Sequence, residues 1–222
     1  MQHIFSYDSP FMKKLCLVGN LALLNILWLI CCLPVFTIGA ATTAMHSVLY
    51  KYIEGIDDDV ARPFFKAFTA NFKQATIIWL PALVVVILLA LDALYLYTNA
   101  TGLMLLMWIP FAVIALIWAV IMTYAFPILA RYDSPTRNII QNSVLLFVMD
   151  LVPSIFVLLM NLVPWVMFVL WPDIYMRLGL MALCFSGSAI SYWNDKVLLG
   201  NFKKRQQKEE DQEEKVQAEA SV

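Results

Sequence analysis

Apolar stretches of about 20 residues recur along this chain, and they constrain its fold more than any other feature. The first, residues 15–34, reads LCLVGNLALLNILWLICCLP, and a helix of that length crosses a hydrocarbon core of about 30 Å. Further stretches of this kind lie at residues 75–97, 103–129, 144–163 and 174–193. Apolar residues make up 62% of the chain and charged residues 14%, which is not the composition of a soluble domain. The sequence therefore predicts an all-α, polytopic transmembrane helical bundle over residues 1–195.

Residues 35–52 form a less apolar segment, VFTIGAATTAMHSVLYKY, in which small side chains are frequent. Gly, Ala, Ser and Thr let helices approach one another closely inside a membrane, so we expect this segment to pack against other helices. It either crosses the membrane as a second span or re-enters from one side. The first alternative gives six spans and the second gives five.

The distribution of positive charge favours six spans. With six, Lys13, Lys14, the basic residues of 51–73 and 131–137, and those of the C-terminal tail lie on one side, and only Arg177 lies on the other. The positive-inside rule then predicts that both termini are cytoplasmic. Five spans would move Lys13 and Lys14 to the outside. Residues 196–222, basic first and acidic after, are expected to form a charged cytoplasmic tail.

Residues 60–74 have the pattern of an amphipathic helix at the membrane interface. At 100° per residue, Arg62, Lys66 and Lys73 fall on one face of such a helix. Phenylalanines lie on the roughly opposite face: Phe64, Phe65, Phe68 and Phe72. A basic stripe opposite an apolar one suits a helix that lies in the interface. The alternative is a docking surface for a cytoplasmic or membrane partner.

Three segments of the N-terminal part have a recognisable pattern: FSYDSPFMK at residues 5–13, NILWLICCLPVFTIGAATTA at 25–44 and FFKAFTANFKQAT at 64–76. Together they resemble the YesL family of bacterial integral membrane proteins, a domain of unknown function. The resemblance implies a multi-pass protein of a Gram-positive-type plasma membrane. Such proteins are often encoded beside carbohydrate-uptake genes, in particular those of sugar ABC transporters. It implies no reaction and transfers no site residues.

Three polar residues inside apolar stretches are candidates for an intramembrane site: Asp150, Asn25 and His46. A carboxylate inside a span is unfavourable by at least ~2.5 kcal/mol, so Asp150 either contacts a cation, proton or substrate hydroxyl or pairs with a polar group near the interface. For Asn25 we expect a hydrogen bond to another helix. His46 is far from the other histidine, His3, and a packed side chain is the expectation.

No catalytic triad spacing, metal-binding motif or phosphate-binding glycine loop occurs in the sequence. We therefore expect no enzymatic activity and no cofactor, and nothing in the charge distribution suggests a nucleic-acid partner. Two functions remain. The first is a non-enzymatic accessory or assembly partner of a carbohydrate ABC transporter, in contact with its permease or ATPase subunits. The second is a small transporter or channel for a sugar or ion, suggested by Asp150 and by prolines within the spans (Pro81, Pro110 and Pro153).

Overall fold

The computed structural model describes residues 10–56, 59–99, 101–132, 134–170, 173, 187–201 and 207. The elements are α1 (Pro10–Cys32), η1 (Val35–Thr37), α2 (Ile38–Ile53), α3 (Ala61–Asn99), η2 (Gly102–Met107), α4 (Trp108–Arg131), α5 (Thr136–Met149) and α6 (Leu151–Leu170). Residues 187–201 form a further helix, named here the C-terminal helix. Among the described residues there is no strand, so the predicted all-α class is confirmed.

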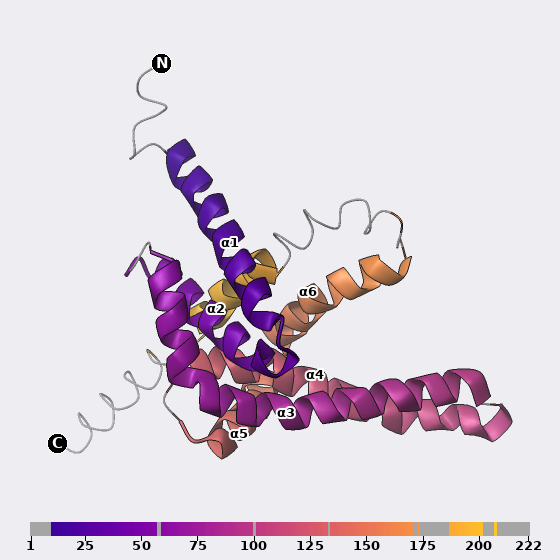
Figure 1. The fold of residues 1–222 in the computed structure, drawn as a ribbon. Helices are drawn as coiled ribbons and strands as arrows, with labels where there is room; N and C mark the ends of the chain where they lie inside the picture. The colour runs from indigo at the N-terminus through magenta and orange to yellow at the C-terminus, as the bar shows by residue number, and fades with distance from the viewer. Residues whose placement is uncertain are drawn as a thin grey trace, which may run out of the picture.

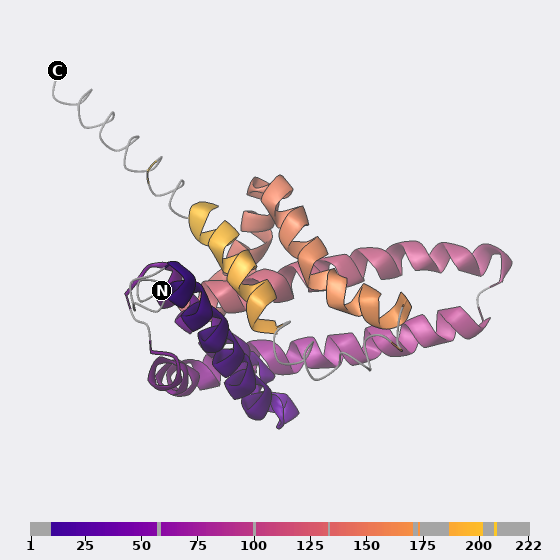
Figure 2. The ribbon, with the colours of Figure 1, turned by 90° about the horizontal axis from the view of Figure 1, so that it is seen from above.

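The longest part of the molecule is an antiparallel hairpin of α3 and α4, which run side by side in both views (Figures 1 and 2). Its far end exposes apolar side chains on both helices, among them Leu91, Leu94 and Ile109. Exposure of such a surface is unfavourable in water, whereas it is favourable in contact with lipid. Three helical segments are long and apolar enough to cross a membrane, within Leu15–Cys32, Ala61–Asn99 and Met104–Arg131. The described chain is that of a multi-pass membrane protein.

The six predicted spans are not confirmed. The described residues provide three candidate spans, or up to four if α5 and α6 together count as one. α2 has 16 residues, and at 1.5 Å per residue it is about 24 Å long, short of a bilayer core. The predicted span 174–193 lies largely outside the described residues, which resume at 187.

The segment predicted as a span over residues 144–163 is not one straight helix in the structure. α5 and α6 meet at a bend of 110°, and Asp150 occupies the bend with φ −122° and ψ 60°. Pro153 supplies a reason for the break. It has no N–H to donate to the carbonyl of Met149, and its ring clashes with that carbonyl in a continuous helix.

Residues 60–74 do not form a separate amphipathic helix, because α3 continues from Ala61 to Asn99. The first part of α3 nevertheless runs across the hairpin. It is seen lengthwise in Figure 1 and end-on in Figure 2, where the rest of α3 stays lengthwise. The basic segment therefore differs in direction from the apolar segment that follows it.

α2 lies at the centre of the helix packing, as its small residues predict. Its buried residues include Ala40, Ala41 and Ala44, which are fully buried against α1, α3 and α4. Gly39 allows the closest approach: a Cβ there would lie 2.7 Å from Cβ of Trp79 and 2.8 Å from the carbonyl oxygen of Ala75. The prediction that residues 35–52 pack tightly against other helices is confirmed.

Candidate functional site

Asn25 joins α1 to the C-terminal helix. Its side chain is fully buried, and Oδ1 accepts a hydrogen bond from the backbone N–H of Ser188 at 3.0 Å. The hydroxyl of Ser188 donates in turn to the carbonyl of Leu21 at 2.8 Å. Gly187 is required at this contact, since a Cβ there would lie 2.6 Å from Oδ1 of Asn25. The expected interhelical hydrogen bond of Asn25 is confirmed.

His46 joins α2 to the same C-terminal helix. Its Nδ1 lies 2.8 and 2.9 Å from the two carboxyl oxygens of Asp195, and both side chains are buried. The expected packed histidine is confirmed, but its acidic partner was not foreseen. We name the four residues Asn25, His46, Ser188 and Asp195 the polar clamp.

Further polar groups surround the His46–Asp195 end of the polar clamp. The ring of Tyr50 lies 6.5 Å from that of His46, and the guanidinium of Arg131 lies 5.7 Å from the centre of the Tyr50 ring. Arg131 also binds Glu54, with Nη1 and Oε1 3.0 Å apart. A row of polar residues thus leads from the buried Asp195 to the half-exposed Arg131–Glu54 ion pair.

The carboxyl of Asp195 is in an environment that resists its ionisation. Burial raises the pKa of Asp195 above its ordinary value, and the neighbouring His46 and Tyr50 lower it only in part. The Tyr50 hydroxyl adjoins Asp195, although it has no partner in hydrogen-bonding geometry among the described residues. The buried carboxyl of Asp195 therefore favours its protonated form. Because it lies between α2 and the C-terminal helix, its contact with His46 can hold these two helices together.

Two of the three predicted intramembrane candidates, Asn25 and His46, are brought together by the C-terminal helix. Asp150 lies elsewhere, half-buried at the bend between α5 and α6. Its N–H bonds the carbonyl of Leu146 at 3.1 Å, and its carbonyl accepts from the N–H of Ser154 at 3.0 Å. Its backbone therefore ends one helix and begins the next.

The sequence contains a signal that would have identified Asp195. Polar residues recur in and just beyond the last apolar stretch with the spacing of one helix face: Ser188, Ser191, Asn194 and Asp195. All four are buried in the structure. Inside an apolar helix such a stripe indicates a contact with other protein helices, since lipid offers polar groups no partner.

The basic face predicted on residues 60–74 is present on the first part of α3. Arg62, Lys66 and Lys73 are exposed, and Phe65 beside them is 50% exposed. The other phenylalanines do not belong to this surface. Phe64 is fully buried against α2, and Phe68 and Phe72 are partly buried in the core. The assignment to a partner- or lipid-facing surface is wrong for Phe64, because this side of α3 packs inward, whereas Phe68 and Phe72 stay partly exposed.

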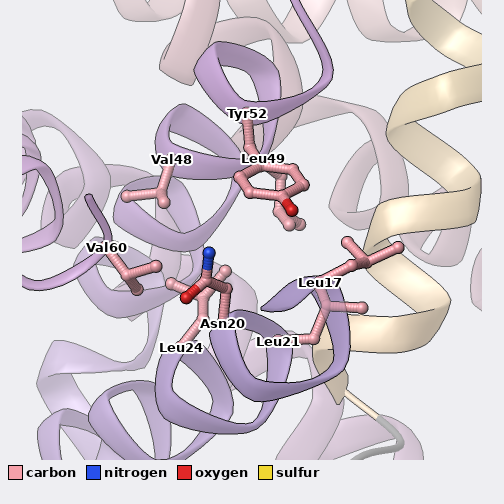
Figure 3. Close-up of a pocket in the computed structure, with 8 residues that line it drawn as sticks. All are labelled: Leu17, Asn20, Leu21, Leu24, Val48, Leu49, Tyr52 and Val60. Atoms are coloured by element: carbon pink, nitrogen blue, oxygen red, sulfur yellow. The ribbon is translucent and has the colours of Figure 1, made fainter. Parts of the chain in front are cut away.

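A small cavity lies between α1, α2 and Val60 (Figure 3). Its volume is about 10 Å³, near the size that holds one water molecule. The side chains of Asn20 and Tyr52 lie at its edge with their polar ends toward it (Figure 3). A shallow groove of about 250 Å³ lies between α4 and α6 and is lined mainly by apolar residues. No group of three metal-ligating side chains occurs within the described part of the chain.

Comparison with known proteins gives two matches. A protein family described as "Protein of unknown function, DUF624" matches residues 21–93. The "Uncharacterized protein YesL" of Bacillus subtilis (strain 168) is 29% identical over 133 residues, which cover 57% of this chain and 61% of that protein. The resemblance to the YesL family is confirmed.

The family match includes Asn25, His46 and the basic face of α3, whereas Asp195 lies beyond residue 93. The chain spans 61% of the length of the curated relative that it matches. No solved structure matches the chain.

Proposed function

We propose that this protein is a non-enzymatic accessory or assembly partner of a carbohydrate ABC transporter in the bacterial plasma membrane. The observation that supports this most directly is the exposed basic face formed by Arg62, Lys66 and Lys73. This face is presented on a rigid element, because Phe64 and Ala67 on the other side of α3 are buried against the α1–α2 core. A fixed row of positive charges suits the recognition of an acidic surface on a permease or ATPase subunit.

The proposal assigns the basic face to the cytoplasmic side, with both termini there and six spans. The sidedness is supported by the positive charges, of which fourteen of fifteen can be collected on one side. α2 alone is short of a bilayer core, but a second crossing by residues 35–52 is supported when η1 and α2 are counted together. η1 and α2 follow each other directly, and at about 2.0 and 1.5 Å per residue they are together about 30 Å long. The first part of α3 then lies along the interface.

Affinity purification from native membranes tests the proposal. The tagged wild-type chain is expected to recover a sugar permease or its ATPase. The triple variant Arg62→Gln, Lys66→Gln, Lys73→Gln is expected to lose them, because it removes the exposed charge and leaves Phe64 in place. The matched control is Arg137→Gln on α5, which is also exposed. Equal recovery by the wild type and the triple variant, or recovery of no transporter subunit by either, contradicts the proposal.

The second candidate function is that of a small transporter or channel, and one observation favours it. The bend of 110° at Asp150 interrupts the α5–α6 pair, and discontinuous helices line substrate sites in many transporters. Against it, Pro81 and Pro127 lie inside continuous helices, and Asn25 and His46 form the polar clamp. Uptake of labelled sugars or ions by reconstituted vesicles, lost in Asp150→Asn, would favour this function over the first.

A further inference from the structure

The C-terminal helix has an unusual buried face. Its buried residues are Ser188, Ser191, Asn194, Asp195, Leu198 and Leu199, so four of the six are polar. Apolar burial, the main source of packing stability, is therefore concentrated at the end near Leu198. Elsewhere on the helix the partly buried Tyr192 packs against the core of α1 and α2, and the remaining contacts include those of the polar clamp. Oδ1 of Asn194 is buried without a hydrogen-bond partner among the described residues, which weakens the docking further.

The two ends of the polar clamp differ in chemistry. At one end Asn25 and Ser188 form neutral hydrogen bonds, which do not change with pH. At the other end the carboxyl of Asp195, which can bind or lose a proton, lies 2.8 Å from Nδ1 of His46. Neutral histidine and ionised aspartate together carry a charge of −1. The buried pair is therefore neutral overall once it has bound one proton. Without that proton it places a negative charge in the interior, which is unfavourable.

We propose that the C-terminal helix is a latch whose docking on α1 and α2 depends on the protonation of the buried His46–Asp195 pair. A proton taken up by the pair closes the latch, and loss of that proton weakens it. This inference does not depend on the proposed function, because it concerns only how the chain holds its own helix.

The charges around the pair are few and can be named. α2 contributes His46 and Tyr50 toward Asp195. Arg131, at the end of α4, lies over the Tyr50 ring and is bound to Glu54, so its charge is already largely balanced. On the C-terminal helix itself, Lys196 is exposed and its Nζ lies 5.6 Å from the centre of the Trp193 ring. Among the described residues, no other charged side chain contacts Asp195 and balances the negative charge of its carboxylate.

The direction of the pH effect follows from burial. The pKa of Asp195 is raised in the docked state, so the docked helix binds the proton more tightly than the released helix does. Docking of the C-terminal helix is therefore strongest at low pH and weakens as the pH rises through the raised pKa of Asp195. Each unit of difference between the docked and released pKa changes the docking equilibrium about tenfold.

Hydrogen exchange on the full-length protein in detergent tests the latch. Protection factors of amides in residues 187–201, corrected for the pH dependence of intrinsic exchange, are expected to rise as the pH is lowered in steps across the range in which the protein stays folded. Amides in the core of α4, such as those near Phe126, are expected not to respond. In Asp195→Asn the acceptor remains but the charge does not, so protection is expected to stay high and flat across this range.

Asn25→Ala provides the matched comparison, because it removes only the neutral end of the polar clamp. It is expected to lower protection of residues 187–201 by a similar factor at every pH and to leave the pH response in place. If Asp195→Asn does not fold, the pH series of the wild type and of Asn25→Ala decides. A wild-type C-terminal helix whose corrected protection does not change with pH overturns the proposal, as does an Asp195→Asn variant that keeps the wild-type response.

Discussion

His46 and Asp195 are separated by 149 residues in the chain, yet Nδ1 of His46 lies 2.8 Å from one carboxyl oxygen of Asp195 and 2.9 Å from the other. The pair joins α2 to the C-terminal helix, and Asn25 joins α1 to the same helix at Ser188. Hydrogen bonds between polar residues thus determine which helices of this apolar chain pack together. Lipid cannot substitute for these contacts, because it offers no hydrogen-bonding groups.

A double-mutant cycle measures the strength of the His46–Asp195 pair. His46→Leu is expected to destabilise the protein by about 3–5 kcal/mol, because it leaves a buried carboxylate without its partner. The double variant His46→Leu, Asp195→Leu is expected to be more stable than either single variant, since no buried charge remains. Reversible denaturation in detergent gives the free energies of unfolding. Additive single effects would show that the two side chains do not interact.

Asn25→Ala is expected to lower the free energy of unfolding by about 1–3 kcal/mol, because the buried N–H of Ser188 loses its acceptor. The control is Asn71→Ala. Asn71 is half-buried and, within the described part of the chain, its side chain donates to the carbonyl of Ala67 in its own helix at 3.1 Å, so its loss is expected to have little effect. Equal destabilisation by the two variants in thermal unfolding would argue against a clamp at Asn25.

Gly39→Ala is expected to destabilise the protein by about 1–3 kcal/mol, as overpacking does in closely packed interiors. The added Cβ would lie 2.7 Å from Trp79 and 2.8 Å from the Ala75 carbonyl, so α2 and α3 must separate. The matched control is Gly19→Ala on the exposed side of α1, where no atom beyond the adjoining part of α1 lies within 4 Å of the new Cβ among the described residues. Thermal unfolding in detergent compares the two. A Gly39→Ala variant as stable as Gly19→Ala would contradict the close crossing.

Tyr124→Phe tests the contact between α4 and α6. The Tyr124 hydroxyl donates to Oγ of Ser154 at 2.6 Å, and both side chains are buried. Its removal is expected to lower the free energy of unfolding by about 1 kcal/mol. An unchanged unfolding midpoint would mean that water or another group replaces the tyrosine hydroxyl.

The apolar stretches predicted the ends of α1, α2, α3 and α4 to within about two residues, but not their starts: α3 begins at Ala61 rather than at residue 75. The bend at Asp150 was not predicted as such, although Pro153 was named among the prolines within the spans. The amphipathic pattern of residues 60–74 correctly predicted that Arg62, Lys66 and Lys73 are exposed. Periodicity alone does not show whether the apolar face contacts lipid or other helices of the protein. Phe64 is a core residue because α2 lies against it, and this depends on tertiary packing.

Asp195 was the principal residue missed at the candidate site. It lies two residues beyond the last apolar stretch, at the end of the predicted bundle, and no partner was predicted for it. A partner 149 residues away cannot be identified from spacing within one segment. The polar stripe from Ser188 to Asp195 predicts that this face of the helix contacts another helix. That the partner of Asp195 is His46 can be known only from the fold.

Site-specific photo-crosslinking in native membranes tests the proposed function most directly. A photoreactive residue replaces Lys66, in the middle of the basic face, or Arg137 on α5 as the control. The account predicts that the residue at position 66 crosslinks to a permease or ATPase subunit of a carbohydrate ABC transporter, and that the residue at position 137 does not. Crosslinks from position 66 to lipid alone, or the same products from both positions, would contradict it.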